Sequence, residues 1–109
     1  GGNVQTYLPV KNGQVVAACL RLDINPGAPN IILCGTGLRI RHAGLRLAQQ
    51  RSPLPIFFKQ APTRWTYQGL FKVTGSCTDP EECAPYITDS GRDPAEISRV
   101  VLLEAVTVL

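Results

Sequence analysis

The sequence lacks the patterns that identify several common classes of protein. No apolar run in its 109 residues approaches the roughly 18–20 residues that a membrane-spanning helix requires. The single histidine, His42, stands between Arg41 and Ala43 without a nucleophile motif. The chain also has no zinc-hydrolase spacing and no G-x-S-x-G elbow. These absences argue against a membrane protein, and they lead us to expect no catalytic residues.

Acidic residues are scarce in the first two thirds of the chain. Residues 1–72 contain nine basic residues and one acidic residue, Asp23, whereas residues 73–109 contain two basic residues against seven acidic ones. An uncompensated positive charge in one continuous part favours an anionic partner, and nucleic acid is the commonest such partner. The alternative is an indifferent basic surface, because folding can bring the acidic part beside the basic part.

The four cysteines do not have the spacing of a metal site. Cys77 and Cys83 are separated by five residues, which is wider than the two to four residues typical of zinc knuckles. Cys19 and Cys34 lie in apolar runs, as small buried residues do. We therefore expect free thiols in a reducing cytoplasm, with no metal and no cofactor.

Glycine and proline are abundant, with ten and nine residues, and this favours short strands joined by turns. We expect one mainly β domain over residues 1–109, a small curved β-barrel with one or two short helices. Residues 1–3, Gly-Gly-Asn, resemble a cloning remnant rather than a signal peptide, so we expect a domain taken from a longer protein.

Strands are predicted over 14–24, 30–34, 54–60 and 97–109, the last as a central strand, and a helix is predicted over 43–51. Residues 75–94 have scattered polarity and no period, which predicts a long loop. In the strand predicted over 14–24, alternation places five residues on a core face: Val16, Ala18, Leu20, Leu22 and Ile24.

The segment RWTYQGLFKV, residues 64–73, is predicted to be a strand with an unusual composition. Strict alternation places five of its residues on one face: Trp65, Tyr67, Gly69, Phe71 and Val73. A glycine on that face indicates a bulge or the close approach of another group. Phe71 is expected in the core, and Trp65 suits either packing or a binding site. Packing does not require Arg64 or Lys72, which fit a nucleic-acid surface at the ends of the strand.

The order of these segments resembles the SRA domain of the PUA-like superfamily, which reads modified cytosine in DNA. The likeness lies in the CGTG turn (34–37), GLRLAQQ (44–50), PLPIFFKQ (53–60) and, above all, TRWTYQGLFKV (63–73). The chain departs from the family where a stacking aromatic normally precedes the turn, because Leu33 and Cys34 stand there. It departs again at Gln68, where the family has an acid.

The resemblance implies a basic concave barrel face that extrudes a base into an aromatic pocket. It implies the following base-pocket candidates: Trp65, Tyr67, Asp23 and Cys34. Contacts to the DNA backbone are expected from a second set: Arg21, Thr36, Gly37, Arg39, Arg41, His42, Lys59, Arg64 and Lys72.

The function expected from the resemblance is recognition of 5-methylcytosine or a related base in double-stranded DNA. The chain would be the specificity domain of a modification-dependent restriction endonuclease, with the nuclease outside it, in a prokaryotic cytoplasm. Two alternative hypotheses remain. One is an RNA-binding PUA-like module, and the other is a protein-interaction domain with a charge-split surface.

Overall fold

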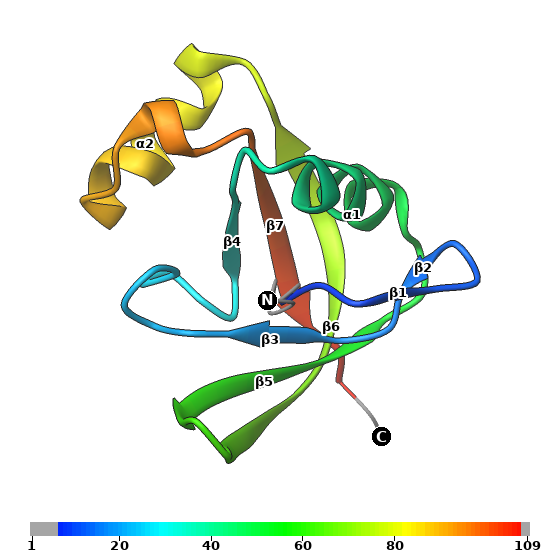
Figure 1. Cartoon of the computed structure of the whole chain (residues 1–109). Helices are drawn as coiled ribbons and strands as arrows, with labels where there is room; N and C mark the ends of the chain where they lie inside the picture. The colour runs from blue at the N-terminus through cyan, green and yellow to red at the C-terminus, as the bar shows by residue number, and fades with distance from the viewer. Residues whose placement is uncertain (1–6, 108–109) are drawn as a thin grey trace.

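The computed structural model describes residues 7–107. Its centre is a five-stranded sheet in the order β3-β5-β6-β7-β4. These strands are β3 (Ala18–Leu20), β5 (Leu54–Ala61), β6 (Arg64–Cys77), β7 (Arg99–Ala105) and β4 (Ile31–Cys34). β3 runs parallel to β5, and the other neighbouring pairs are antiparallel. The sheet curls into a half-barrel (Figure 1), so the expected small curved β-barrel with short helices is confirmed.

The remaining elements lie around this sheet. β1 (Val10–Lys11) and β2 (Gln14–Val15) form a separate two-stranded hairpin. Two helices follow, α1 (Leu38–Gln49) and α2 (Pro80–Ser90), and then a short 3-10 helix, η1 (Pro94–Glu96). The cloning remnant expected at residues 1–3 lies outside the described residues.

Two clusters of buried side chains lie on opposite faces of β4 and β7. The larger fills the half-barrel beneath α1 and includes Ile32 and Val101, whereas the smaller packs α2 against Leu33 and Val100. Because consecutive residues of a strand point to opposite faces, a strand covered on both faces is apolar throughout. This explains the continuous apolar runs of β4 and β7, and the expectation that β7 is central is confirmed.

β6 does not keep its aromatic residues on a single face. The pairing of β5 with β6 shifts register between Tyr67 and Gly69, and Gly69 has φ of +113°, which favours glycine. The extra residue at this bulge reverses the alternation. Phe71 is therefore buried, with 5% of its surface exposed, whereas Trp65 and Tyr67 lie outward. The expected core position of Phe71 is confirmed, but the single aromatic face is wrong.

The strand predicted over 14–24 is also wrong in part. Only β2 and β3 form, and backbone hydrogen bonds from the amides of Ile24 and Asn25 to the carbonyl of Arg21 close a turn. Asn25 is buried, and its Oδ1 accepts a hydrogen bond from the Leu33 amide at 2.8 Å. Of the predicted core face, Ala18 and Leu20 are buried, Ile24 is half-buried, and Val16 and Leu22 are exposed.

α1 begins five residues before the predicted start at Ala43. Its buried stripe is Ala43, Gly44 and Leu47, with Ile40 packed partly against the core one turn earlier. The contact of Ile40 extends the helix towards its N-terminus, although Leu38 remains largely exposed. Tertiary packing therefore sets the start of α1.

Residues 75–94 are not a long loop, because β6 continues to Cys77 and α2 follows. Asp79 caps α2 by accepting hydrogen bonds from the amides of Glu81 and Glu82, each at 3.1 Å. Pro80 occupies the first turn, and Gly91, at φ of +75°, ends the helix. The sequence did not predict α2 because the helix buries only Cys83 and Ile87, and its other residues give no clear apolar period.

Candidate nucleic-acid interface

In the part of the chain that the structure describes, the acidic residues of the last third do not pair with the basic residues of the first two thirds. Within residues 7–107 the structure has one ion pair, Arg21 with Asp23 at 2.6 Å, so the acids of α2 and η1 neutralise no basic residue directly. Two of those acids, Asp79 and Asp93, cap their helices instead. α2 lies at the far end of the molecule from the free end of the β5–β6 hairpin (Figure 1). The basic surface is therefore available to an anionic partner.

The outward side of β5 and β6 carries exposed aromatic rings beside a cation. Phe57 pairs with Tyr67, and Lys59 pairs with Trp65, so the four side chains share one side of the sheet. We call these four residues the aromatic face. The rings of Phe57 and Tyr67 have centroids 5.5 Å apart, and Lys59 Nζ lies 5.5 Å from the centroid of Trp65.

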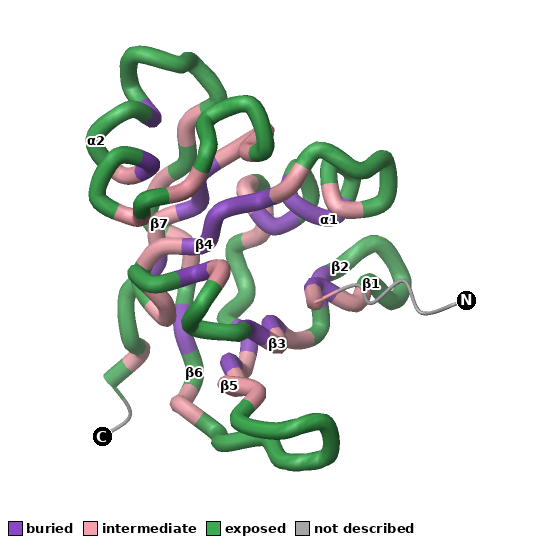
Figure 2. Tube along the Cα trace, turned by 60° about the vertical axis from the view of Figure 1, so that its left-hand side comes forward, coloured by how far each residue is buried: buried purple, intermediate pink, exposed green. Residues whose placement is uncertain are grey.

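Two rings of the aromatic face, those of Trp65 and Tyr67, are exposed to solvent, whereas Phe57 and Lys59 are half-buried. The exposed fraction is 45% for Trp65 and 57% for Tyr67. Figure 2 shows the end of the β5–β6 hairpin as an exposed segment of the chain. Arg64 at the hairpin turn and Lys72 further along β6 are exposed as well. Burial therefore does not account for two large rings at this position.

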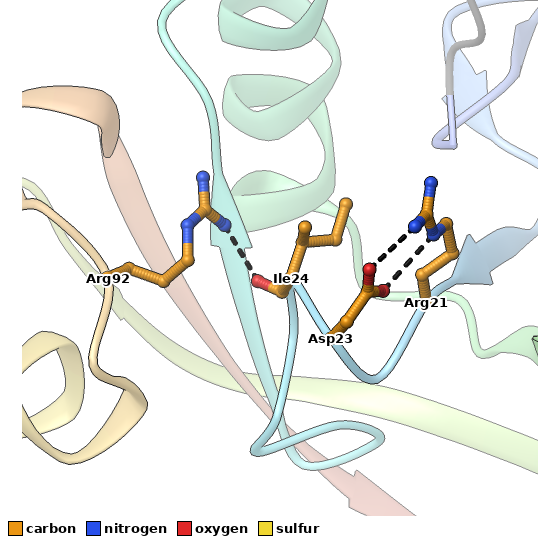
Figure 3. Close-up of polar contacts among 4 residues, drawn as sticks. All are labelled: Arg21, Asp23, Ile24 and Arg92. Carbon is orange, nitrogen blue, oxygen red and sulfur yellow. Dashed lines mark hydrogen bonds and ion pairs between the residues drawn. The ribbon is translucent and has the colours of Figure 1, made fainter.

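Asp23 lies in the turn after β3, where its carboxylate is already engaged. Both of its oxygens accept hydrogen bonds from the Arg21 guanidinium, at 3.1 and 2.6 Å (Figure 3). That contact lowers the pKa of Asp23 below its usual value. A second contact joins the same turn to the segment that follows α2: Arg92 Nη1 donates a hydrogen bond of 2.7 Å to the carbonyl of Ile24. An amine from a base would have to compete with Arg21 for this carboxylate.

Cys34 cannot contact a base. Its side chain has no exposed surface and lies in the larger core cluster beneath α1. Burial raises the pKa of the Cys34 thiol to about 12. The expectation that Cys34 lines a base pocket is therefore wrong: the position packs β4 against the helix.

A second group of expected backbone contacts lies around the start of α1. All five residues are exposed: Thr36, Gly37, Arg39, Arg41 and His42. Arg41 Nε donates a hydrogen bond of 2.7 Å to the carbonyl of Thr36, which holds that side chain over the turn. α1 and the free end of the β5–β6 hairpin lie apart in both views, with β3 and the paired strands between them in Figure 1 (Figures 1 and 2). The structure therefore does not bring the two groups into one site.

The sequence interpretation missed four residues that belong with these groups. Phe57 completes the aromatic face, and its alternation with Pro55 and Lys59 along β5 could have indicated this. Arg46, Gln49 and Arg51 lie at the end of α1 beside the β1–β2 hairpin. All three lie within the helix predicted over 43–51, but the sequence does not show that the β1–β2 hairpin packs beside them.

Comparisons with known proteins identify no relative of this chain: no family model, curated protein or solved structure matches it. Within the described residues no helix is both long and apolar enough to cross a membrane. Residues 7–107 also contain no group of three or more histidine, cysteine, aspartate or glutamate side chains that could hold a metal ion. The geometry of the two basic regions is therefore the basis for a functional proposal.

Proposed function

We propose that this chain is a DNA-binding module that recognises a modified base, 5-methylcytosine or a related base, in double-stranded DNA. It would serve as the specificity domain of a modification-dependent restriction endonuclease in the prokaryotic cytoplasm, with the nuclease in another domain. The observation that carries the proposal is the aromatic face, where Trp65 and Tyr67 are exposed beside Lys59.

The chemistry of base recognition supports this assignment. A protein that inspects a base in a duplex takes it out of the stack and needs an aromatic plane to receive it. Stacking on one aromatic side chain is worth about 1–3 kcal/mol per base, so Trp65 alone could contribute roughly fivefold to 150-fold to the affinity for an extruded base. Among residues 7–107, Lys59 and Arg64 beside the rings form no ion pair with a carboxylate, and they suit the flanking phosphates.

One observation favours recognition of single-stranded RNA as a second candidate function. The rings of the aromatic face lie on the open side of two paired strands, where unpaired bases can stack directly. Proteins that read RNA sequence stack such bases on exposed aromatic residues of a sheet. An RNA-binding module would prefer a single strand to a duplex.

Anisotropy titrations with matched labelled duplexes test the proposal. The duplexes carry cytosine, 5-methylcytosine, 5-hydroxymethylcytosine or N6-methyladenine at one position, and a single-stranded RNA of the same sequence is titrated in parallel. We expect one modified duplex to bind about tenfold or more tightly than the others. Trp65→Ala should remove most of that preference, whereas Trp65→Phe should retain part of it.

Val16→Ala is a matched control, because Val16 is similarly exposed and lies outside the aromatic face. It should leave the preference unchanged. Equal affinity for all four duplexes would show that no modified base is recognised. Tighter binding to the RNA strand would favour the second candidate function.

A further inference from the structure

A groove runs along α1 on the side that faces the β1–β2 hairpin. Its wider part is a hollow of about 450 Å³ between the hairpin turn at Gly13 and Gln14 and the end of the helix at Arg46, Gln49 and Arg51. This hollow opens at the surface and is lined mainly by side chains that donate hydrogen bonds.

A second hollow, of about 250 Å³, adjoins the first because Arg46 lines both. Val10, Arg39 and His42 complete its lining together with the buried Ala43. Arg39, His42 and Arg46 are spaced by three and four residues, so they follow one flank of the helix. We call the two hollows together the α1 groove.

Side-chain hydrogen bonds fix the walls of the α1 groove. Gln50 clips the hairpin to the end of α1: its Oε1 accepts from the Val15 amide at 2.9 Å, and its Nε2 donates to the Val15 carbonyl at 3.0 Å. Arg46 Nη1 donates to the carbonyl of Gly13 at 3.3 Å. The guanidinium of Arg46 is thereby held at the junction of the two hollows.

The α1 groove carries positive charge without a counter-ion. No carboxylate lines either hollow, and the one ion pair of residues 7–107 lies elsewhere, between Arg21 and Asp23. The end of a helix carries a partial negative charge of about half a unit. The guanidinium groups of Arg39, Arg46 and Arg51 outweigh that charge, so the groove favours an anion.

The length of the charged flank suits a chain of phosphates rather than a single anion. A helix rises 1.5 Å per residue, so Arg39 and Arg46 are separated by about 10 Å along the axis. One nucleic-acid strand advances about 3.4 Å per nucleotide along its axis, and this span therefore covers about three nucleotides. We propose that the α1 groove binds consecutive phosphates of one nucleic-acid strand, with Arg39 and Arg46 as the principal contacts.

This inference rests on the proposed function only in taking nucleic acid as the ligand. It requires no modified base and no contact with the aromatic face. The test uses an unmodified 20-base-pair labelled duplex and measures affinity across a range of salt concentrations. Arg39→Gln and Arg46→Gln should each weaken binding severalfold and each lower the slope of log K against log salt by about 0.9.

Three matched variants complete the test. Lys11→Gln removes the same charge from β1 without lining either hollow, so its slope should stay at the wild-type value. Val16→Ala, at an exposed residue that lines neither hollow, should also leave the slope unchanged. Arg39 donates no hydrogen bond within the described residues, so Arg39→Gln reports on phosphate contact even if Arg46→Gln loosens the hairpin. The double variant Arg39→Gln/Arg46→Gln should lower the slope by about 1.8.

The possible outcomes separate this inference from the proposed function. A wild-type slope in the double variant, or an equal loss in Lys11→Gln, would overturn the inference. So would amide shifts around the groove with inorganic phosphate but not with the duplex, because the site would then hold free phosphate. Another outcome is equal affinity for modified and unmodified duplexes, with a salt slope that still depends on Arg39 and Arg46. That result would support phosphate binding in the α1 groove and refute recognition of a modified base. No binding to any nucleic acid at low salt would overturn both.

Discussion

Gly44 of α1 lies directly against Cys34 of β4. A Cβ atom on residue 44 would sit 2.9 Å from Cys34 Sγ and 3.3 Å from Cys34 Cβ, which is closer than carbon and sulfur atoms pack. This contact sets the distance between the helix and the sheet. Both residues are buried, and the side chain of Cys34 fills the space that the glycine leaves.

Gly44→Ala should therefore destabilise the protein, although alanine is the better helix former by about 1 kcal/mol. Overpacking of a filled core costs about 1–3 kcal/mol, and the net loss in the free energy of unfolding should be smaller than that cost. Urea unfolding measures it. Gly75→Ala is the control, because its Cβ would meet Leu102 at an ordinary 3.8 Å.

A double-mutant cycle identifies the contact itself. Cys34→Ala makes room for the new methyl group, so Gly44→Ala should cost less in that background than in the wild type. Equal costs in the two backgrounds would show that the clash lies with another neighbour.

The buried side chain of Asn25 gives a second prediction. Its Oδ1 accepts the hydrogen bond of the Leu33 amide at 2.8 Å. Asn25→Ala leaves a buried amide without a partner and should cost about 1–3 kcal/mol of unfolding free energy. Asn30→Ala is the control, since Asn30 is exposed and donates only to the Leu103 carbonyl. Similar losses in the two variants would contradict a special role for Asn25.

The sequence predicted the parts of the fold that depend on local pattern. The strands at 30–34, 54–60 and 97–109 were predicted because each contains an apolar run, and the structure has strands at Ile31–Cys34, Leu54–Ala61 and Arg99–Ala105. A bulge was one of the two explanations offered for Gly69, and the structure has that bulge. Its consequence, that Phe71 turns inward while Tyr67 stays outward, depends on the pairing of β5 with β6 and needed the structure.

The features missed from the sequence depend on contacts between distant segments. Arg39 and His42 precede the predicted helix, and only the packing of Ile40 on the core makes them part of α1. The α1 groove also needs Gln50 to hold the β1–β2 hairpin, across 35 residues of sequence. No local sequence pattern indicates a contact between such distant residues, so the sequence alone does not predict the groove.

The cap of α2 gives a third prediction. Asp79 accepts two hydrogen bonds from the first turn of the helix, and Asp79→Ala removes both. The expected cost is about 1 kcal/mol, and hydrogen exchange of the α2 amides should become faster. Asp79→Asn keeps an acceptor and should retain most of the protection. Unchanged exchange in Asp79→Ala would mean that the packing of Cys83 and Ile87 alone holds the helix.

The thiols of Cys77 and Cys83 give a fourth prediction, because their sulfur atoms lie 2.8 Å apart. Oxidised glutathione should join them: one thiolate attacks the glutathione disulfide and releases glutathione, and the second thiol displaces another glutathione from the mixed disulfide. The product, measured by mass spectrometry after alkylation, has lost two hydrogen atoms and ties the end of β6 to α2. Cys83→Ser should instead stop at the mixed disulfide on Cys77.

The rate of this oxidation should depend on pH. Burial, together with the neighbouring thiol and the carboxylates of Glu82 and Asp79, raises the pKa of Cys77 to about 12. Since only the thiolate attacks, little reactive sulfur is present near pH 7, and more forms as the pH rises towards that value. The disulfide should therefore form slowly at pH 7 and about a hundredfold faster at pH 9. A rate that stays constant across this range would contradict the raised pKa of Cys77.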